Sequence, residues 1–128
     1  PVELGEWNHM AVTYDADSEE IVLYVNGEAK ADGTVGTTAF STVNLGRRAS
    51  SKNCPLNGAL DDVSIFDRGL SSDEIGQLFD GQDIADGLVL SWGFAEEDGF
   101  ACVDSSENGN DGSLVGYPAG KVSNWMAG

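Results

Sequence analysis

The sequence predicts an all-β protein with one short helix. Apolar and polar residues alternate with a period of two in several short segments, which is typical of strands. Seventeen glycines among 128 residues suit many short strands joined by tight turns. A single Ser-x-x-Glu motif stands before an apolar stripe at helical spacing. With 41% hydrophobic residues, the chain has enough apolar material for one modest domain.

The first predicted strand covers residues 7–14 (WNHMAVTY), and a polar turn separates it from an almost continuous apolar strand at 21–25. Asn26-Gly27 follows directly, and both residues tolerate a positive φ, so we expect a tight hairpin turn there. Alternation also predicts strands at 40–45, 58–66 and 88–94. In the strand at 58–66 it places Asp61 on the apolar face, where a carboxylate needs a hydrogen-bond donor or a metal ion.

The predicted helix begins at a capping box. The Ser71 hydroxyl and the Glu74 side chain are placed to bind the free amides at the helix start. The apolar stripe that follows is Ile75, Leu78 and Phe79. Gly81 predicts the end of the helix after about two turns.

The net charge of −16 restricts the partners of the chain. Twenty-two carboxylates against six Lys and Arg residues leave no basic surface for phosphate groups, so we expect no nucleic-acid binding. No stretch approaches the ~18 apolar residues of a membrane span, so we expect no membrane insertion. The carboxylates either hold a hard cation such as Ca²⁺ or form the solvated acidic surface of a salt-adapted extracellular protein.

The two cysteines, Cys54 and Cys102, lie far apart in the sequence. With no Cys-x-x-Cys pair and only one histidine, a structural zinc site is excluded. An even pair in an acidic chain that is poor in lysine fits an extracellular disulfide. Closing a loop of about 48 residues would stabilise the fold by roughly 4 kcal/mol. The alternative is two separate buried thiols.

Three stretches together carry a family resemblance. They are WNHMAVTYD at 7–15 with LYVNG at 23–27; GALDDVSIF at 58–66 with Arg68, Leu70, Ser71 and Glu74-Ile75; and LVLSWGF at 88–94 with Gly99, Val103, Asp104 and NGNDG at 108–112. The chain resembles the LamG, or concanavalin A-like, lectin and glucanase superfamily in its bacterial form. The resemblance implies a concanavalin A-like jelly-roll sandwich of two antiparallel sheets with one short helix.

The order of these stretches departs from the family pattern. Residues 1–83 are similar to the C-terminal half of a LamG domain, with its hairpin, closing strand and short helix, whereas residues 84–128 are similar to the N-terminal half. The central strands of the family are missing. The chain is therefore an excerpt of a tandem array, a shortened circular permutant, or a protomer that completes its sandwich with strands of a neighbouring copy.

The resemblance implies a calcium site where the opening loop meets the closing strand. The matching positions are Asp61, Asp104, Asn108 and Asp111, whose carboxylate and amide oxygens suit a hard ion. The alternative for the loop is Asx-turn chemistry, in which these side chains bind their own backbone. Because Cys102 lies two residues before Asp104, a disulfide to Cys54 would brace the loop.

Exposed aromatic side chains could stack on sugar rings. We expect Trp7 and Trp92, at motif positions, to lie in the core, and Tyr117 and Trp125 to make surface contacts with a glycan. The single histidine, His9, is expected to be packed rather than catalytic. The Glu-x-Asp-x-x-Glu run of the family's glycoside hydrolases is missing, so we expect no enzyme activity.

These observations predict a non-catalytic, calcium-stabilised module of a secreted protein, extracellular or at the cell surface, that binds a polysaccharide or another glycan, or acts in adhesion. The alternative is a structural repeat of an extracellular fibre or surface layer, in which neighbouring copies of the chain assemble by strand exchange.

Overall fold

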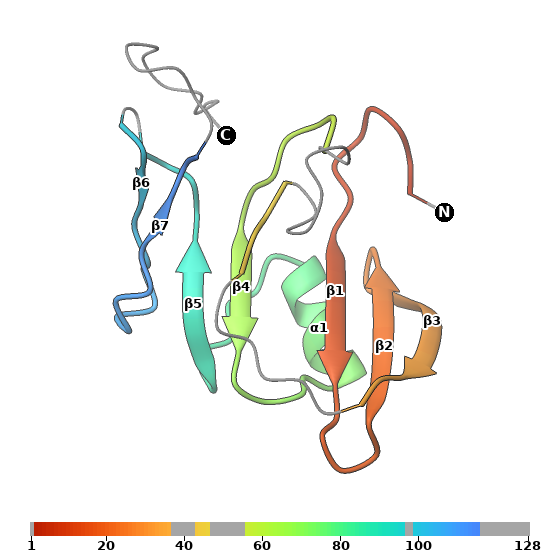
Figure 1. Cartoon of the computed structure of the whole chain (residues 1–128). Helices are drawn as coiled ribbons and strands as arrows, with labels where there is room; N and C mark the ends of the chain where they lie inside the picture. Colours follow the sequence, from red (N-terminus) through yellow and green to blue (C-terminus); the bar gives the residue numbers. More distant parts are fainter. Residues whose placement is uncertain (1, 37–42, 47–55, 97–98, 116–128) are drawn as a thin grey trace. The chain divides into compact units, whose positions relative to one another are not determined.

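The computed structural model describes residues 2–36, 43–46, 56–96 and 99–115. The chain divides into two compact units, one formed by residues 1–39 with 66–87 and the other by residues 40–65 with 88–128. The elements of the described residues are β1 (Met10–Tyr14), β2 (Glu20–Val25), β3 (Glu28–Thr34), β4 (Val63–Phe66), α1 (Ser72–Phe79), β5 (Leu88–Trp92), β6 (Ala101–Cys102) and β7 (Gly112–Ser113) (Figure 1).

The first unit contains a three-stranded antiparallel sheet in the order β1-β2-β3 (Figure 1). β1 pairs with β2 from Met10 opposite Val25 to Tyr14 opposite Ile21. The predicted turn at Asn26-Gly27 is confirmed, because both residues adopt positive φ values of 52° and 77° and lead directly into β3. A tight two-residue turn of this kind fixes the register of the β2-β3 pair.

The helix α1 has the predicted capping box. The Glu74 amide donates to the Ser71 hydroxyl (3.3 Å), and the Ser71 amide donates to Glu74 Oε2 (2.8 Å). Ile75 is only 1% exposed, so it anchors the helix in the core of this unit. Phe79 in the last turn contacts His9, with ring centroids 6.0 Å apart. A Cβ atom at Gly27 would meet Phe79 at 3.1 Å, so the hairpin turn and the helix end pack closely.

The second unit contains two two-stranded sheets, β4-β5 and β6-β7, and buries Leu90 and Cys102. The predicted strands here are too long. Strand β4 begins only at Val63, because Asp62 adopts a φ of +49° that an extended chain does not allow, and β5 ends at Trp92, before Phe94 with a φ of +47°. The described part of the predicted strand at 40–45, residues 43–45, is not a strand, and residues 40–42 lie outside the described part of the chain.

The prediction of an all-β fold with antiparallel sheets and one short helix is confirmed for the described residues. The alternation of apolar and polar residues does not predict the paired strands β6 and β7, since each is only two residues long. The predicted boundary at residue 83 separates two halves of the family pattern, whereas the compact units are defined by contacts in the structure. The boundary at residue 83 stays a prediction. None of the described helices is long and apolar enough to span a membrane.

Candidate functional site

The loop between β6 and β7 is organised around the carboxylate of Asp104, which is 7% exposed. Its Oδ1 accepts the backbone amides of Ser91 (2.8 Å) and Ser106 (2.9 Å). Its Oδ2 accepts the Ser106 hydroxyl (2.8 Å) and the amide of Asn110 (2.9 Å). A carboxylate offers about four acceptor positions, so these bonds use all of them. The side chain thus closes the loop on itself and ties it to β5.

The same donors determine the charge state of Asp104. Burial by itself raises the pKa of a carboxyl group, but the amides of Ser91, Ser106 and Asn110 and the Ser106 hydroxyl outweigh it and lower the pKa of Asp104 to about 2. Asp104 is therefore an anion throughout the neutral range.

Further bonds join this loop to strand β5. The Asn110 side chain donates to the Val89 carbonyl (2.7 Å), and the Asn108 side chain donates to the Leu88 carbonyl (3.1 Å). In the other direction, the indole N–H of Trp92 donates to the Asn110 carbonyl (3.0 Å). The Trp92 ring lies directly over Gly112, where a Cβ atom would meet it at 2.8 Å. Only glycine fits beneath the ring without a shift.

The residues predicted to bind calcium are only partly brought together. Asp104, Asn108 and Asp111 share the loop, and Asp111 Oδ1 accepts the Asp104 amide (2.8 Å). The predicted inward orientation of Asp61 is wrong: Asp61 is exposed, its Oδ1 accepts the Asp62 amide (3.0 Å), and it precedes β4 rather than lying in it. Within the described ranges, no three His, Cys, Asp or Glu side chains gather as a metal-binding group would require. Calcium binding stays a prediction.

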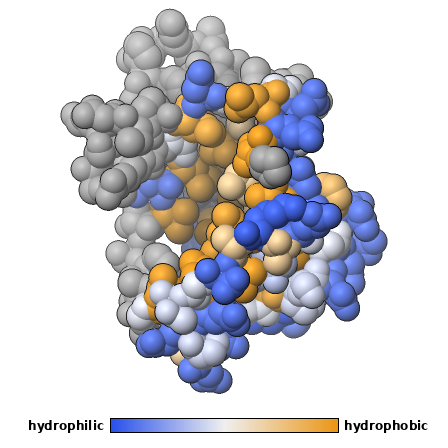
Figure 2. Space-filling view, turned by 90° about the vertical axis from the view of Figure 1, so that its right-hand side faces the viewer, coloured by the Kyte–Doolittle hydropathy of each residue, from blue (hydrophilic) through white to orange (hydrophobic). Residues whose placement is uncertain are grey.

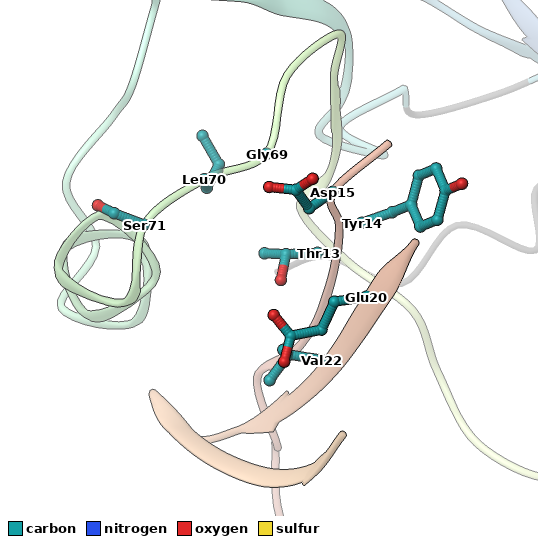
Figure 3. Close-up of a pocket in the computed structure, with 8 residues that line it drawn as sticks. All are labelled: Thr13, Tyr14, Asp15, Glu20, Val22, Gly69, Leu70 and Ser71. Carbon is teal, nitrogen blue, oxygen red and sulfur yellow. The ribbon is translucent and has the colours of Figure 1, made fainter. Parts of the chain in front are cut away.

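A pocket of about 240 Å³ lies in the first unit. Its lining residues are Thr13, Tyr14, Asp15, Glu20, Val22, Gly69, Leu70 and Ser71. Figure 3 shows the side chains of Thr13, Asp15 and Glu20 on the side of the strands that faces the segment 69–71, whereas the Tyr14 ring points away. Carboxylates and hydroxyl groups are the side chains that bind sugar hydroxyl groups, so this pocket offers hydrogen bonds but no aromatic platform.

One wall of the pocket is held by an ion pair. The guanidinium of Arg68 donates to both carboxylate oxygens of Glu74, from Nη1 at 3.0 Å and from Nη2 at 2.6 Å. Arg68 Nε also lies 2.9 Å from Asp86 Oδ2. The bidentate bond to Arg68 and the amide of Ser71 lower the pKa of Glu74 to about 2. The segment from Arg68 to the helix cap is therefore fixed at both ends.

The predicted placement of the aromatic residues needs one correction. Trp7 is 68% exposed and does not lie in the core, because it belongs to the segment before β1 and not to the strand itself. Trp92 is half-buried over Gly112, and Tyr117 and Trp125 lie outside the described residues. The space-filling view shows that apolar side chains reach the surface between hydrophilic ones (Figure 2).

The disulfide prediction also falls partly outside the described residues. Cys102 is buried and forms no disulfide with another described residue, whereas Cys54 lies outside the described residues. Burial, with the negative charge of Glu96 nearby, raises the pKa of the Cys102 thiol to about 11. As a thiol, Cys102 is therefore protonated and unreactive at neutral pH. The pairing with Cys54 stays a prediction.

Comparison with known proteins gives a family match. A family model described as the concanavalin A-like lectin/glucanases superfamily matches residues 1–76, which is more than half of the chain. This range includes the whole pocket, the capping box and Trp7. A comparison with curated proteins found no match.

Two solved structures are similar to the chain. One is an S-layer domain-containing protein (residues 221–444) of Clostridium thermocellum, 33% identical over 62% of this chain and 42% of its own, with a TM-score of 0.55. The other is a putative carbohydrate binding protein of Bacteroides ovatus, 24% identical over 87% of this chain and 35% of its own, with a TM-score of 0.70. The second likeness shows the fold alone. The chain spans less than half of each solved chain.

Proposed function

We propose that this chain, which belongs to the concanavalin A-like lectin/glucanases superfamily, is a non-catalytic carbohydrate-binding or adhesive module of a secreted or cell-surface protein. The observation that carries the proposal is the family match over residues 1–76 together with the pocket inside that range. The pocket groups that can hydrogen-bond to a sugar are carboxylates and hydroxyl groups, from Thr13, Asp15, Glu20 and Ser71.

The Asp15 carboxylate of the pocket suits hydrogen bonding to a sugar hydroxyl group. The amides of Ser18 and Asp17 donate to Asp15 Oδ1 at 2.9 and 2.8 Å and lower the pKa of Asp15. Asp15 is therefore ionised at neutral pH and accepts hydrogen bonds, which is the role expected of a sugar-binding carboxylate.

The experiment for this proposal is a glycan array probed with the folded chain in calcium and in EDTA. Binding to a defined set of glycans supports the module. A folded chain that binds no glycan in either condition contradicts it.

Calcium at the loop of residues 104–111 is a separate proposal. The loop supplies oxygen atoms of the kind that Ca²⁺ prefers, but both Asp104 oxygens already accept two hydrogen bonds each. As arranged, the loop is not a preformed calcium site, so an ion would have to displace some of these donors. Calcium that binds only the folded chain would raise its melting temperature relative to EDTA. An unchanged melting temperature would mean that hydrogen bonds alone close the loop.

A second candidate function is a structural repeat of a surface layer or fibre that assembles by strand exchange. The observation that favours it is an exposed apolar strand: among the described residues β1 is an edge strand of its sheet, and Met10 and Val12 on it are 59% and 60% exposed. The likeness to part of an S-layer domain-containing protein agrees with this candidate. Light scattering over a range of concentrations tests it, because a strict monomer at every concentration would eliminate self-assembly.

A further inference from the structure

Side-chain hydrogen bonds close the segment before β1 into a loop. The Asn8 side chain accepts the Glu3 amide (3.0 Å) and donates back to the Glu3 carbonyl (2.8 Å), and it also donates to the Glu6 carbonyl (3.0 Å). Gly5 makes the turn at the tip with a φ of +83°. One side chain thus closes a six-residue ring, residues 3–8, which we call the Asn8 loop.

The Asn8 loop is anchored to the hairpin turn between β2 and β3. The Asn26 side chain accepts the amide of His9 (2.9 Å), and the Asn26 amide donates to the His9 carbonyl (2.9 Å). His9 in turn packs against Phe79 of α1. A loop held at its base in this way is ordered before a ligand arrives, so less conformational entropy is lost on binding.

The loop presents one large flat side chain to solvent. Trp7 is 68% exposed, and no hydrogen bond among the described residues uses its indole N–H. The neighbouring carboxylates of Glu3 and Glu6 are exposed and likewise have no partner within the described part of the chain. An indole face packs against the C–H face of a pyranose ring, while carboxylates accept bonds from the ring hydroxyl groups. Both kinds of contact are available on the same short loop.

The negative charge of the chain favours neutral sugars over anionic ones as ligands. With a net charge of −16 and two carboxylates on the loop itself, an anionic polymer of uronic acids would be repelled at low ionic strength. A neutral hexose polymer carries no charge to repel and many hydroxyl donors to bind.

We propose that Trp7, Glu3 and Glu6 of the Asn8 loop form a binding subsite for a neutral polysaccharide, in which Trp7 stacks on a pyranose ring and the two carboxylates accept hydrogen bonds from its hydroxyl groups. This inference rests on the proposed carbohydrate-binding function and names a site for it. It differs from the pocket beside α1, which has no aromatic platform.

The test is native gel electrophoresis in gels that contain a soluble β-glucan, galactomannan, xyloglucan or polygalacturonate. The variants are Trp7→Ala, Trp7→Phe and Leu4→Ala. Leu4 is the matched control because it lies in the same loop and is 96% exposed, but it has no flat ring. Circular dichroism and thermal melts confirm that each variant is folded.

We expect a neutral polysaccharide to retard the wild-type chain and Trp7→Ala to weaken this binding about tenfold or more, while Trp7→Phe retains most of it and Leu4→Ala retains all of it. Wild-type retardation that Trp7→Ala leaves unchanged overturns the subsite but not the carbohydrate-binding function. No retardation of the wild type by any neutral polysaccharide overturns the subsite, and failure on the glycan array as well overturns the function.

Two other outcomes also contradict the proposal. Equal retardation by polygalacturonate would overturn the choice of neutral sugars. If light scattering shows that the wild type self-associates and that both Trp7→Ala and Leu4→Ala abolish this association without changing the retardation, the loop is a protein interface instead.

Discussion

Replacing Gly112 by alanine tests the packing of the Asp104 loop against β5. A Cβ atom at this position would lie 2.8, 3.0 and 3.1 Å from Cζ2, Cη2 and Cε2 of Trp92. Carbon atoms pack at about 3.5–4.0 Å, so the indole ring would have to move by roughly 0.7 Å. The hydrogen bond from Trp92 Nε1 to the Asn110 carbonyl resists this movement.

The expected change follows from two opposing effects. Overpacking a filled site costs about 1–3 kcal/mol. Gly112 does not adopt a positive φ, so alanine fits its backbone and restricts the unfolded chain, which offsets about 0.4–1 kcal/mol. We expect a net loss of about 1–2 kcal/mol in the free energy of unfolding.

The assay is urea unfolding of Gly112→Ala beside a matched control, Gly76→Ala. Gly76 lies inside α1, and a Cβ atom there would meet nothing within 4 Å. The same chemical change should therefore stabilise the chain by about 0.5–1 kcal/mol at position 76. Circular dichroism and tryptophan fluorescence should follow both transitions, so that a separate transition of either unit is detected.

The two substitutions should thus shift the unfolding midpoint in opposite directions. If Gly112→Ala unfolds at the same urea concentration as the wild type, or at a higher one, while Gly76→Ala shows its increase, the Trp92 ring does not lie over Gly112. The loop would then not be tied to β5 through the Trp92 ring.

Three further predictions concern the side chains of Asp104 and Ser71. Asp104→Asn should lower the melting temperature by about 10 °C, as thermal melts can check. The carboxylate accepts backbone N–H groups with both oxygens, whereas the NH₂ group of asparagine is itself a donor and would leave some of these N–H groups without an acceptor. The pKa of Asp104 is lowered from 3.8 to about 2, so its contribution to stability is complete above pH 4 and is lost as the pH falls through 2. If the melting temperature of Asp104→Asn depended on acid pH in the same way as that of the wild type, this expectation would be contradicted. Ser71→Ala should cost about 0.5–2 kcal/mol in urea unfolding through loss of the helix cap, and an unchanged midpoint would mean that Glu74 caps the helix without it.

Local patterns were sufficient to predict the elements that depend on local chemistry. The hairpin at Asn26-Gly27 and the capping box at Ser71 were predicted because the backbone conformation there is determined by the residues themselves. Strand ends were predicted poorly. Alternation continues through Asp62 and up to Phe94, but a positive φ at each residue stops the strand, and no alternation pattern reports φ.

The candidate site was predicted in composition but not in geometry. The Asp, Asn and Gly residues of the 104–112 loop indicated either calcium or Asx turns, and the choice depends on where the amides of Ser91 and Asn110 point. Those amides come from different elements, so their positions follow only from the tertiary structure. The place of Trp7 in a motif predicts a core position, whereas its exposure depends on where β1 begins. The hydrogen bonds from Asn8 back to Glu3 and Glu6 that close the Asn8 loop leave no strong signal in the sequence.

The most direct test of carbohydrate binding is a glycan array probed with the folded wild-type chain and, in parallel, with Trp7→Ala. We expect the wild type to bind a set of neutral glycans and the variant to lose most of this signal while its melting temperature stays the same. A wild-type chain that is folded by circular dichroism and binds no glycan on the array would contradict this expectation.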